Sequence, residues 1–490
     1  MHNVRAMDKE IRTRPTGWFQ PRANMSLPMP QYFHNHSLRA CVAVATFTGL
    51  LASAPAQAVN LSQTGQGQVL IFPYYSVRGG TDSYLSVINN TDRTKALSVR
   101  LRESRNGRSV SSLTLFLAPF EMWTAGVTAT AEGAKLITTD RSCTSPRIPP
   151  EGLALSNVNY TGAVVAPGFV QQGNDGGDTS LDRVREGFIE VIELGEVTSA
   201  FADQQGLFPY GFNGLQPCNA VELDRGPSAG ANALAAPSGG LSGSGTLVNV
   251  AGGSEYSYEP LVLDDFSDQN LWPASRAQLS SATPKISRLF DRGRLITSTW
   301  TRGEDAVSAV LMRSSLTNEF VLETTTLSGT DWLVNMPTKH YYVPVAGSTA
   351  KALPPFAGAF SNQGACQFSY GDVQLVGREG EALTPEVFLE PQTLLCGETS
   401  VLTFNGSQLL ASAHGEAVGV KDGAAGSNGF GRLDLGLNGE AMESLEGHVY
   451  RGLPVNGFMV RDFINGNVNG VLSNYGGSFA HKYQTDITTP

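Results

Sequence analysis

The sequence carries little charge and, apart from one segment near its start, has no long apolar run. Charged residues make up 16% of the 490 residues, well below the roughly 25% usual in soluble proteins. A chain of this kind fits a long helical bundle poorly. The net charge of −10 disfavours binding to nucleic acid or to anionic lipid. No apolar run after residue 58 is long enough to cross a bilayer, so we expect no transmembrane helix in the mature chain.

The one apolar run, residues 40–52, is too short to span a membrane. It follows Arg39 and leads to Ala56-Gln-Ala58, which is a small-x-small cleavage pattern. We therefore interpret residues 1–58 as a secretory signal peptide with an upstream segment; a buried core helix is the alternative. Its removal takes away six basic and two acidic side chains, so the mature chain is more acidic. This predicts an exported protein, located outside the cell, on its surface or in the periplasm.

Cysteine is scarce, with five in the chain. Cys41 would leave with the signal peptide, and an even number remaining in an exported chain indicates disulfides. A metal site is disfavoured, because there is no Cys-x-x-Cys motif and no histidine close to any of the four. Four cysteines allow three pairings. We favour Cys143 with Cys218 and Cys366 with Cys396, since each pair brackets one region.

What the sequence has in abundance is glycine and short apolar runs. Its 54 glycines exceed the usual share of about 7%. Between residues 67 and 127 the apolar runs are separated by turn formers such as Gly79 and Asn106. Apolar and polar residues alternate at 97–101 and 113–117, so one face of each strand should be buried and the other solvated. The pattern predicts an all-β fold of antiparallel β-sandwiches, with long glycine-rich loops and little helix.

Strand-like runs continue to the C-terminus and suggest two β-rich regions. We expect an N-terminal β-sandwich region over 59–350 and a C-terminal β-rich region over 351–490. A stretch rich in Gly, Ala, Pro and Ser at about 203–245 would interrupt the first region, with strands from both sides of it sharing a sheet. Residues 306–316 predict one short helix with Asp305 as its cap.

Four blocks of sequence resemble blocks found in uncharacterised exported β-rich proteins of Gram-negative bacteria. They are residues 67–75, 89–92, 117–125 and 330–339. The resemblance implies bacterial export and β structure and brings no activity with it. The strands around Asn89 show a weaker likeness to immunoglobulin-like domains of bacterial surface proteins.

One polar loop collects oxygen ligands of the kind that calcium prefers outside the cell. The candidate ligands are Asn174, Asp175, Asp178 and Asp182. Their spacing differs from that of the EF-hand loop, and a solvated turn is the alternative. We expect no other cofactor.

Recognisable catalytic motifs are missing. The four histidines after residue 58 are far apart, and no serine lies in a Gly-x-Ser-x-Gly motif. Glu190 and Glu193 form a carboxylate pair on the predicted strand 187–194, where we expect both on the solvated side. Most tryptophans lie in apolar runs that predict core packing. Trp272, beside Asn270, is the candidate for an exposed ring that stacks on carbohydrate.

These observations favour a non-enzymatic secreted or cell-envelope protein that acts in surface binding, adhesion or assembly. Its partners would be other envelope or extracellular proteins or glycans. The alternative is a secreted carbohydrate-active hydrolase that uses loop carboxylates, which requires two carboxyl groups facing each other across a cleft. A third hypothesis is self-assembly, in which an unpaired strand at 59–72 completes the sheet of a neighbouring copy.

Overall fold

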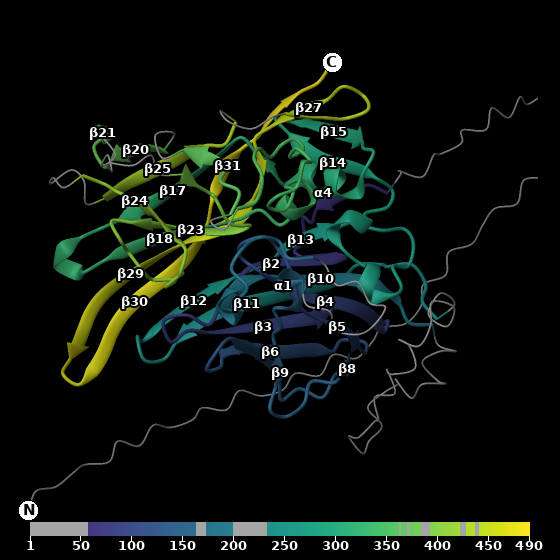
Figure 1. Ribbon diagram of the computed structural model, residues 1–490, viewed down its shortest axis with the longest axis horizontal. Helices are drawn as coiled ribbons and strands as arrows, with labels where there is room; N and C mark the ends of the chain where they lie inside the picture. Colours follow the sequence, from purple (N-terminus) through teal and green to yellow (C-terminus); the bar gives the residue numbers. More distant parts are fainter. Residues whose placement is uncertain are drawn as a thin grey trace, which may run out of the picture. The chain divides into compact units, whose positions relative to one another are not determined.

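The computed structural model is mostly β, with 49% of residues in strands and 8% in helices (Figure 1). The all-β prediction is therefore confirmed. The structure describes residues 57–162, 173–198, 233–361, 364–369, 373–383, 393–421, 428–436 and 441–490. All but the last two residues of the predicted signal peptide, and most of the predicted insertion, lie outside these described residues.

The first sandwich is built from strands between residues 60 and 264. Its seven-stranded sheet contains, in spatial order, β1 (Asn60–Leu61), β13 (Leu261–Asp264), β2 (Val69–Ser76), β10 (Glu186–Glu196), β4 (Lys95–Glu103), β5 (Ser109–Leu117) and β8 (Cys143–Ser145). Its six-stranded sheet contains β12 (Ser254–Tyr258), β11 (Leu241–Asn249), β3 (Asp82–Asn89), β6 (Met122–Ala129), β7 (Ala134–Ile137) and β9 (Leu153–Ala154). One core of buried apolar side chains, including Phe72 and Trp123, fills the space between the two sheets.

Strands from both sides of the predicted insertion share these sheets, as expected: β11 pairs with β3, and β13 pairs with β2. The same pairing contradicts the hypothesis of an unpaired strand at 59–72. In the structure β2 lies between β10 and β13, and β1 pairs with β13. The strands of this segment are therefore already paired within the sheet of their own chain.

The second sandwich combines strands from both sides of the boundary that we expected at residue 350. One sheet contains β21 (Ala382–Leu383), β20 (Val373–Gly377), β25 (Asn428–Asp434), β17 (Ser315–Val321) and β31 (Lys482–Gln484). The other contains β24 (Gly415–Val418), β23 (Thr399–Phe404), β18 (Gly329–Asn335), β29 (Asn456–Val468) and β30 (Val471–Ala480). Because β17 and β18 pair with strands that follow residue 350, the second sandwich begins at β17.

A third group of elements covers the outer face of the seven-stranded sheet. It contains α4 (Gly303–Leu311), the hairpin of β14 (Ile286–Asp291) and β15 (Arg294–Thr299), and the sheet of β26 (Met442–Glu443), β27 (Val449–Arg451) and β32 (Asp486–Thr488). Buried residues of α4, among them Val307 and Val310, belong to one core with Ile71 and Ile192 of the sheet. The predicted helix is present but shorter, and Asp305 lies in its first turn without capping it.

The remaining short strands and the second α-helix are α1 (Val158–Thr161), β16 (Met312–Arg313), β28 (Leu453–Pro454), β19 (Phe368–Ser369) and β22 (Thr393–Leu394). Short 3-10 turns lie at η1 (Leu181–Arg185), η3 (Ala274–Arg276), η4 (Leu279–Ser281), η5 (Thr324–Thr326) and η6 (Lys339–Tyr341). No helix among the described residues is long and apolar enough to cross a membrane.

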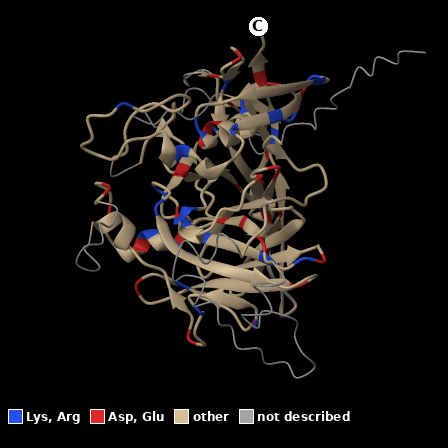
Figure 2. Cartoon of the chain, turned by 90° about the vertical axis from the view of Figure 1, so that its right-hand side faces the viewer, with Lys and Arg blue, Asp and Glu red and all other residues tan. Residues whose placement is uncertain are grey.

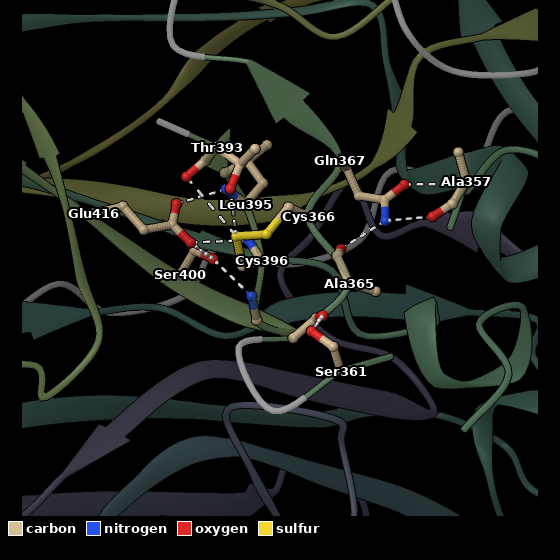
Figure 3. Close-up of a disulfide and its surroundings, with 12 residues drawn as sticks. Ala357, Ser361, Ala365, Cys366, Gln367, Thr393, Leu395, Cys396, Ser400 and Glu416 are labelled. Carbon is tan, nitrogen blue, oxygen red and sulfur yellow. Dashed lines mark hydrogen bonds between the residues drawn. A yellow bond between two sulfur atoms is a disulfide. The ribbon is translucent and has the colours of Figure 1, made fainter. Parts of the chain in front are cut away.

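The predicted disulfide between Cys366 and Cys396 is present and links positions 30 residues apart (Figure 3). It joins the loop before β19 to the loop after β22. The predicted pairing of Cys143 with Cys218 stays a prediction, because Cys218 lies outside the described residues.

Candidate functional site

The outer face of the six-stranded sheet carries a groove of about 520 Å³. Its floor is formed by β11, β3, β6 and β7, and half of the residues that line it carry a hydroxyl group. They are Tyr84, Ser86, Thr124, Thr138, Thr139, Ser244 and Thr246, and apolar residues such as Ile137 and Pro150 line the rest. A volume of this size is within the range of small-ligand sites in proteins.

Strand alternation explains why these side chains share one face. On β3, Leu85 and Val87 are buried in the sandwich core, so Tyr84 and Ser86 point outward. Tyr84 lies opposite Gly126 on β6 and opposite Thr246 on β11. The strand register thus places one aromatic ring at the centre of a hydroxyl-lined surface.

The tyrosine ring is accessible because its neighbour has no side chain. Tyr84 is 47% exposed. A Cβ atom added at Gly126 would lie 3.3 Å from the ring, which is closer than most Cβ contacts. Beside the ring, the hydroxyls of Ser86 and Ser244 are 3.0 Å apart and exposed. The glycine therefore lets the ring lie against the sheet while its other face meets solvent.

Charge is confined to one end of the groove. Lys135 on β7 donates a hydrogen bond from Nζ to the backbone oxygen of Glu151 at 2.9 Å. Glu151 is the one carboxylate among the residues that line this groove. The groove therefore offers hydroxyls and an aromatic face to a ligand, with a single residue of each charge at its rim.

The outer face of the other sheet is entirely different. Glu190 and Glu193 on β10 are 1% and 0% exposed, so our expectation of a solvated side for them is wrong. Arg102 Nε lies 2.9 Å from Glu190 Oε2, and Lys95 Nζ lies 2.7 Å from Glu193 Oε1. Arg102 and Glu190 are buried because other elements cover this face. Lys95 and Glu193 point to the opposite side of the sheet, where Glu193 also accepts hydrogen bonds from the backbone nitrogens of Ser238 and Gly239. In Figure 2 basic and acidic residues lie scattered along the strands, with long uncharged stretches between them.

A second buried group of charges surrounds Arg183. Its guanidinium lies 2.9 Å from Glu103 Oε1 and 2.8 Å from Asp175 Oδ2, and all three side chains are at most 2% exposed. The same guanidinium lies over the ring of Tyr160, 4.1 Å from its centroid. Arg183 therefore neutralises two acids in the protein interior, where an unpaired carboxylate would be costly.

The predicted calcium ligands Asn174, Asp175, Asp178 and Asp182 have other partners. Asp175 is held by Arg183, and Asp182 lies 2.7 Å from Arg78. Asp178 accepts a hydrogen bond from a nearby serine hydroxyl. Within the part of the chain that the structure describes, no three His, Cys, Asp or Glu side chains are grouped to hold a metal ion. The calcium hypothesis stays a prediction that these contacts do not support.

His340 and Glu398 form a buried pair next to the sheet face that carries Arg102. His340 Nδ1 and Glu398 Oε1 are 2.5 Å apart. Burial raises the pKa of Glu398 to about 8, against a smaller opposing effect of Arg102. Burial, together with Arg102, lowers the pKa of His340 well below its usual value. Both shifts indicate a neutral pair at neutral pH, with the carboxyl proton shared with the imidazole.

The loop that carries Glu398 is fixed from three directions (Figure 3). The disulfide ties Cys396 to Cys366. The carboxylate of Glu416 accepts hydrogen bonds from the backbone nitrogen of Cys396 at 2.8 Å and from the hydroxyl of Ser400 at 3.0 Å. The Nζ of Lys339 donates to three successive backbone oxygens of the loop, at 2.8–3.0 Å. Neither His340 nor Glu398 lines the groove, so we interpret this cluster as structural.

The aromatic residue that we expected to be exposed is not. Trp272 is 9% exposed and belongs to the core beneath α4, so the expectation of an accessible ring there is wrong. Its neighbours Asn270 and Pro273 suggested a surface loop, but that loop packs against the sheet. The exposed ring in the groove is that of Tyr84. The alternating hydroxyls at residues 242–246 were the sequence signal for this face.

Fold and groove together define a class, that of all-β proteins built from two antiparallel sandwiches with a ligand-sized groove on one open sheet. Comparisons with known protein families, with curated proteins and with solved structures find no match for this chain.

Proposed function

We propose that the protein is an exported, non-enzymatic binding protein that holds a carbohydrate chain in the groove on the six-stranded sheet. The observation that carries this proposal is the half-exposed ring of Tyr84, which lies at the centre of a hydroxyl-lined groove. An aromatic face is complementary to the apolar face of a sugar ring. Hydroxyl side chains match the donors and acceptors at the rim of the sugar.

The lining favours a neutral ligand and binding over hydrolysis. Hydrolysis of a glycosidic bond generally uses two carboxyl groups on opposite sides of the sugar. Glu151 is the one carboxylate in this lining, and it lies at the rim with Lys135. The hydrolase alternative would need a second acid from elsewhere, so binding is the function that the groove favours.

Two observations support export. A disulfide such as that between Cys366 and Cys396 persists mainly in oxidising compartments. In addition, the sequence carries the cleavage pattern that ends at Ala58. N-terminal sequencing of the protein recovered from outside the cytoplasm should give a first residue near Val59. A protein that keeps residues 1–58 would contradict this part of the proposal.

Binding can be tested with a panel of soluble neutral and acidic polysaccharides in affinity electrophoresis and calorimetry. We expect Tyr84→Ala to weaken binding to the best neutral glycan about tenfold or more, a loss of ~1.4 kcal/mol or more. Gly126→Val should have a similar effect, because its side chain would press on the ring. Phe290→Ala is the matched control, since Phe290 is also exposed (72%) but lies outside the groove.

Three results would each overturn the proposal. The first is that no glycan in the panel binds, and the second is that Tyr84→Ala binds as well as the wild type. The third is release of new reducing ends from a bound glycan, which would make the protein a hydrolase.

A further inference from the structure

The hairpin of β14 and β15 carries an apolar pair on its outward face. Phe290 and Leu295 lie directly opposite each other on the two strands, and their side chains are 72% and 63% exposed. The next residues along each strand, Leu289 and Ile296, point the other way and pack with the core that contains α4. The apolar pair therefore lies on the solvent side of a two-stranded sheet whose inner side is already packed.

The turn at the end of this hairpin is held in place. Asp291 pairs with Arg294, and the two residues between them, Arg292 and Gly293, have φ angles of 47° and 81°, as a tight two-residue hairpin turn requires. Arg292 Nη2 donates a hydrogen bond to the backbone oxygen of Thr485 at 3.2 Å, and the hydroxyl of Thr485 donates one to the carboxylate of Asp291. The side chains at the turn are thus presented from a fixed backbone.

The charge of this hairpin is opposite in sign to that of the whole chain. Residues 285–295 contain basic side chains at positions 285, 288, 292 and 294 and a single acidic one, Asp291. The acid is 5% exposed, whereas Arg292 and Arg294 are exposed to solvent. The whole chain, by contrast, has a net charge of −10. The end of the hairpin is therefore both cationic and apolar on an acidic protein.

This combination matches the two layers of an anionic membrane surface. Apolar side chains that are exposed side by side gain free energy when they leave water for the acyl region. Arginines beside them can reach the phosphate groups while their aliphatic stems stay in the apolar layer. A soluble polyanion would match the arginines but would leave Phe290 and Leu295 in water. The apolar pair therefore favours a lipid surface as the partner.

We propose that this hairpin docks the protein on an anionic lipid surface, with Phe290 and Leu295 in the interface and Arg292 and Arg294 at the headgroups. The negative net charge does not prevent this contact, because salt screens charges that are more than about 8–10 Å away. It disfavours contact through the acidic parts of the surface, so the hairpin is the part that faces the lipid.

The contact uses the outward face of the hairpin and no free strand edge. The edge of β14 is already occupied by Val59, whose backbone exchanges hydrogen bonds of 2.8 Å with Ile286 and Arg288. Phe290 and Leu295 also lie outside the groove on the six-stranded sheet. The proposal therefore does not depend on the proposed glycan site, and either one can fail without the other.

Vesicle flotation tests the proposal, with the protein recovered from outside the cytoplasm. We expect binding to vesicles of phosphatidylcholine and phosphatidylglycerol in equal parts, weaker binding to phosphatidylcholine alone, and weaker binding at raised salt. Phe290→Ala should lower partitioning about tenfold, and Arg294→Glu should lower it about fivefold or more.

Two matched controls change the same kinds of side chain elsewhere. Tyr84→Ala removes an exposed aromatic ring from the groove. Arg378→Glu reverses a charge on a side chain that is 71% exposed in another turn. Both variants should partition like the wild type. Soluble dextran sulfate is the probe for a polyanion without an apolar layer, and it should bind more weakly than the mixed vesicles.

Quenching by brominated lipids tests whether the apolar pair enters the membrane. The tryptophan of Phe290→Trp should be quenched in mixed vesicles, whereas the described tryptophans of the wild type are at most 9% exposed. Phe430→Trp is the control, since Phe430 is 41% exposed on β25 of the second sandwich; its tryptophan should add no quenching.

Four results would each overturn the proposal. They are no binding to the mixed vesicles, Phe290→Ala partitioning like the wild type, equal quenching of the two tryptophan variants, and tighter binding to dextran sulfate than to the vesicles. The last result would identify a soluble polyanion as the partner.

Discussion

The two sheets of the first sandwich share one core but have outer faces of opposite character. The six-stranded sheet turns hydroxyls and Tyr84 toward solvent and carries almost no charge in its groove. The seven-stranded sheet turns Arg102 and Glu190 outward, yet these side chains are buried under other elements. The face that carries charged side chains is thus the face that is buried from solvent. The elements that pack on a strand face therefore decide whether that face is exposed to solvent. The polarity of its side chains predicts this exposure poorly.

The buried charges have a cost that hydroxyls on an open face do not have. Removing a charge from water is compensated only when its partner is close and well oriented. Here Arg102 Nε lies 2.9 Å from Glu190 Oε2, and the two residues belong to the paired strands β4 and β10. The strand register therefore brings the two charges together, and the covering elements bury a pair that is already formed. The groove on the open face contains no such buried pair.

The largest effect should come from removing a buried cation. We expect Arg183→Met to lower the free energy of unfolding by about 3–5 kcal/mol, because Glu103 and Asp175 would remain buried without their partner. Denaturant unfolding followed by tryptophan fluorescence measures the change. Lys135→Met, at the rim of the groove, is the control on the open face and should change stability by no more than ~0.5 kcal/mol. Equal effects of the two substitutions would mean that burial does not set the cost of losing a charge.

The disulfide should have the next largest effect. Replacing Cys366 and Cys396 by serine removes a disulfide that joins positions 30 residues apart. A disulfide that closes a loop of this size raises the free energy of unfolding by about 2–4 kcal/mol. The same unfolding measurement applies, with and without reductant. Reductant should then shift the unfolding midpoint of the wild type more than that of the double variant. An unchanged midpoint in the double variant would show that Lys339 and Glu416 hold the loop without the disulfide.

A smaller effect concerns pH. The pKa of Glu398 is raised to about 8 in the folded protein from an ordinary value near 4.5. Between these values the unfolded chain releases the proton that the folded protein keeps, so stability falls as the pH rises. Compared with Glu398→Gln, which keeps a hydrogen-bond donor for His340, the wild type should lose roughly 2–3 kcal/mol between pH 5 and 8. Parallel stability curves of the two proteins over this range would show that Glu398 is ionised throughout.

The smallest effect belongs to the open face. We expect the double substitution of Ser86 and Thr124 by alanine to change stability by less than ~0.5 kcal/mol, because both side chains are at the solvent surface. Glycan binding should still weaken, since these hydroxyls line the groove. Thermal unfolding and calorimetry measure the two properties separately. A large loss of stability would mean that the groove is part of the structural core.

The sequence predicts the β-strands well, because alternation and turn formers are local signals. It also predicts the Cys366–Cys396 disulfide from the small number of cysteines and their separation. The exposures of Glu190 and Trp272 depend on which elements cover them, and these elements are distant in sequence. The groove depends on β3, β6 and β11 lying side by side, with Gly126 opposite Tyr84. Such non-local pairing leaves no mark in a single run of residues.

Cys396 lies two residues before Glu398, in the loop at the joint between the two sandwiches. The anchoring of this loop therefore depends on whether the surrounding compartment oxidises thiols. Before the sulfurs are oxidised, the segment that supplies this acid has one fewer anchor, and the two halves of the chain are less firmly closed on each other. Oxidation of the two thiols would then close this loop and complete its anchoring.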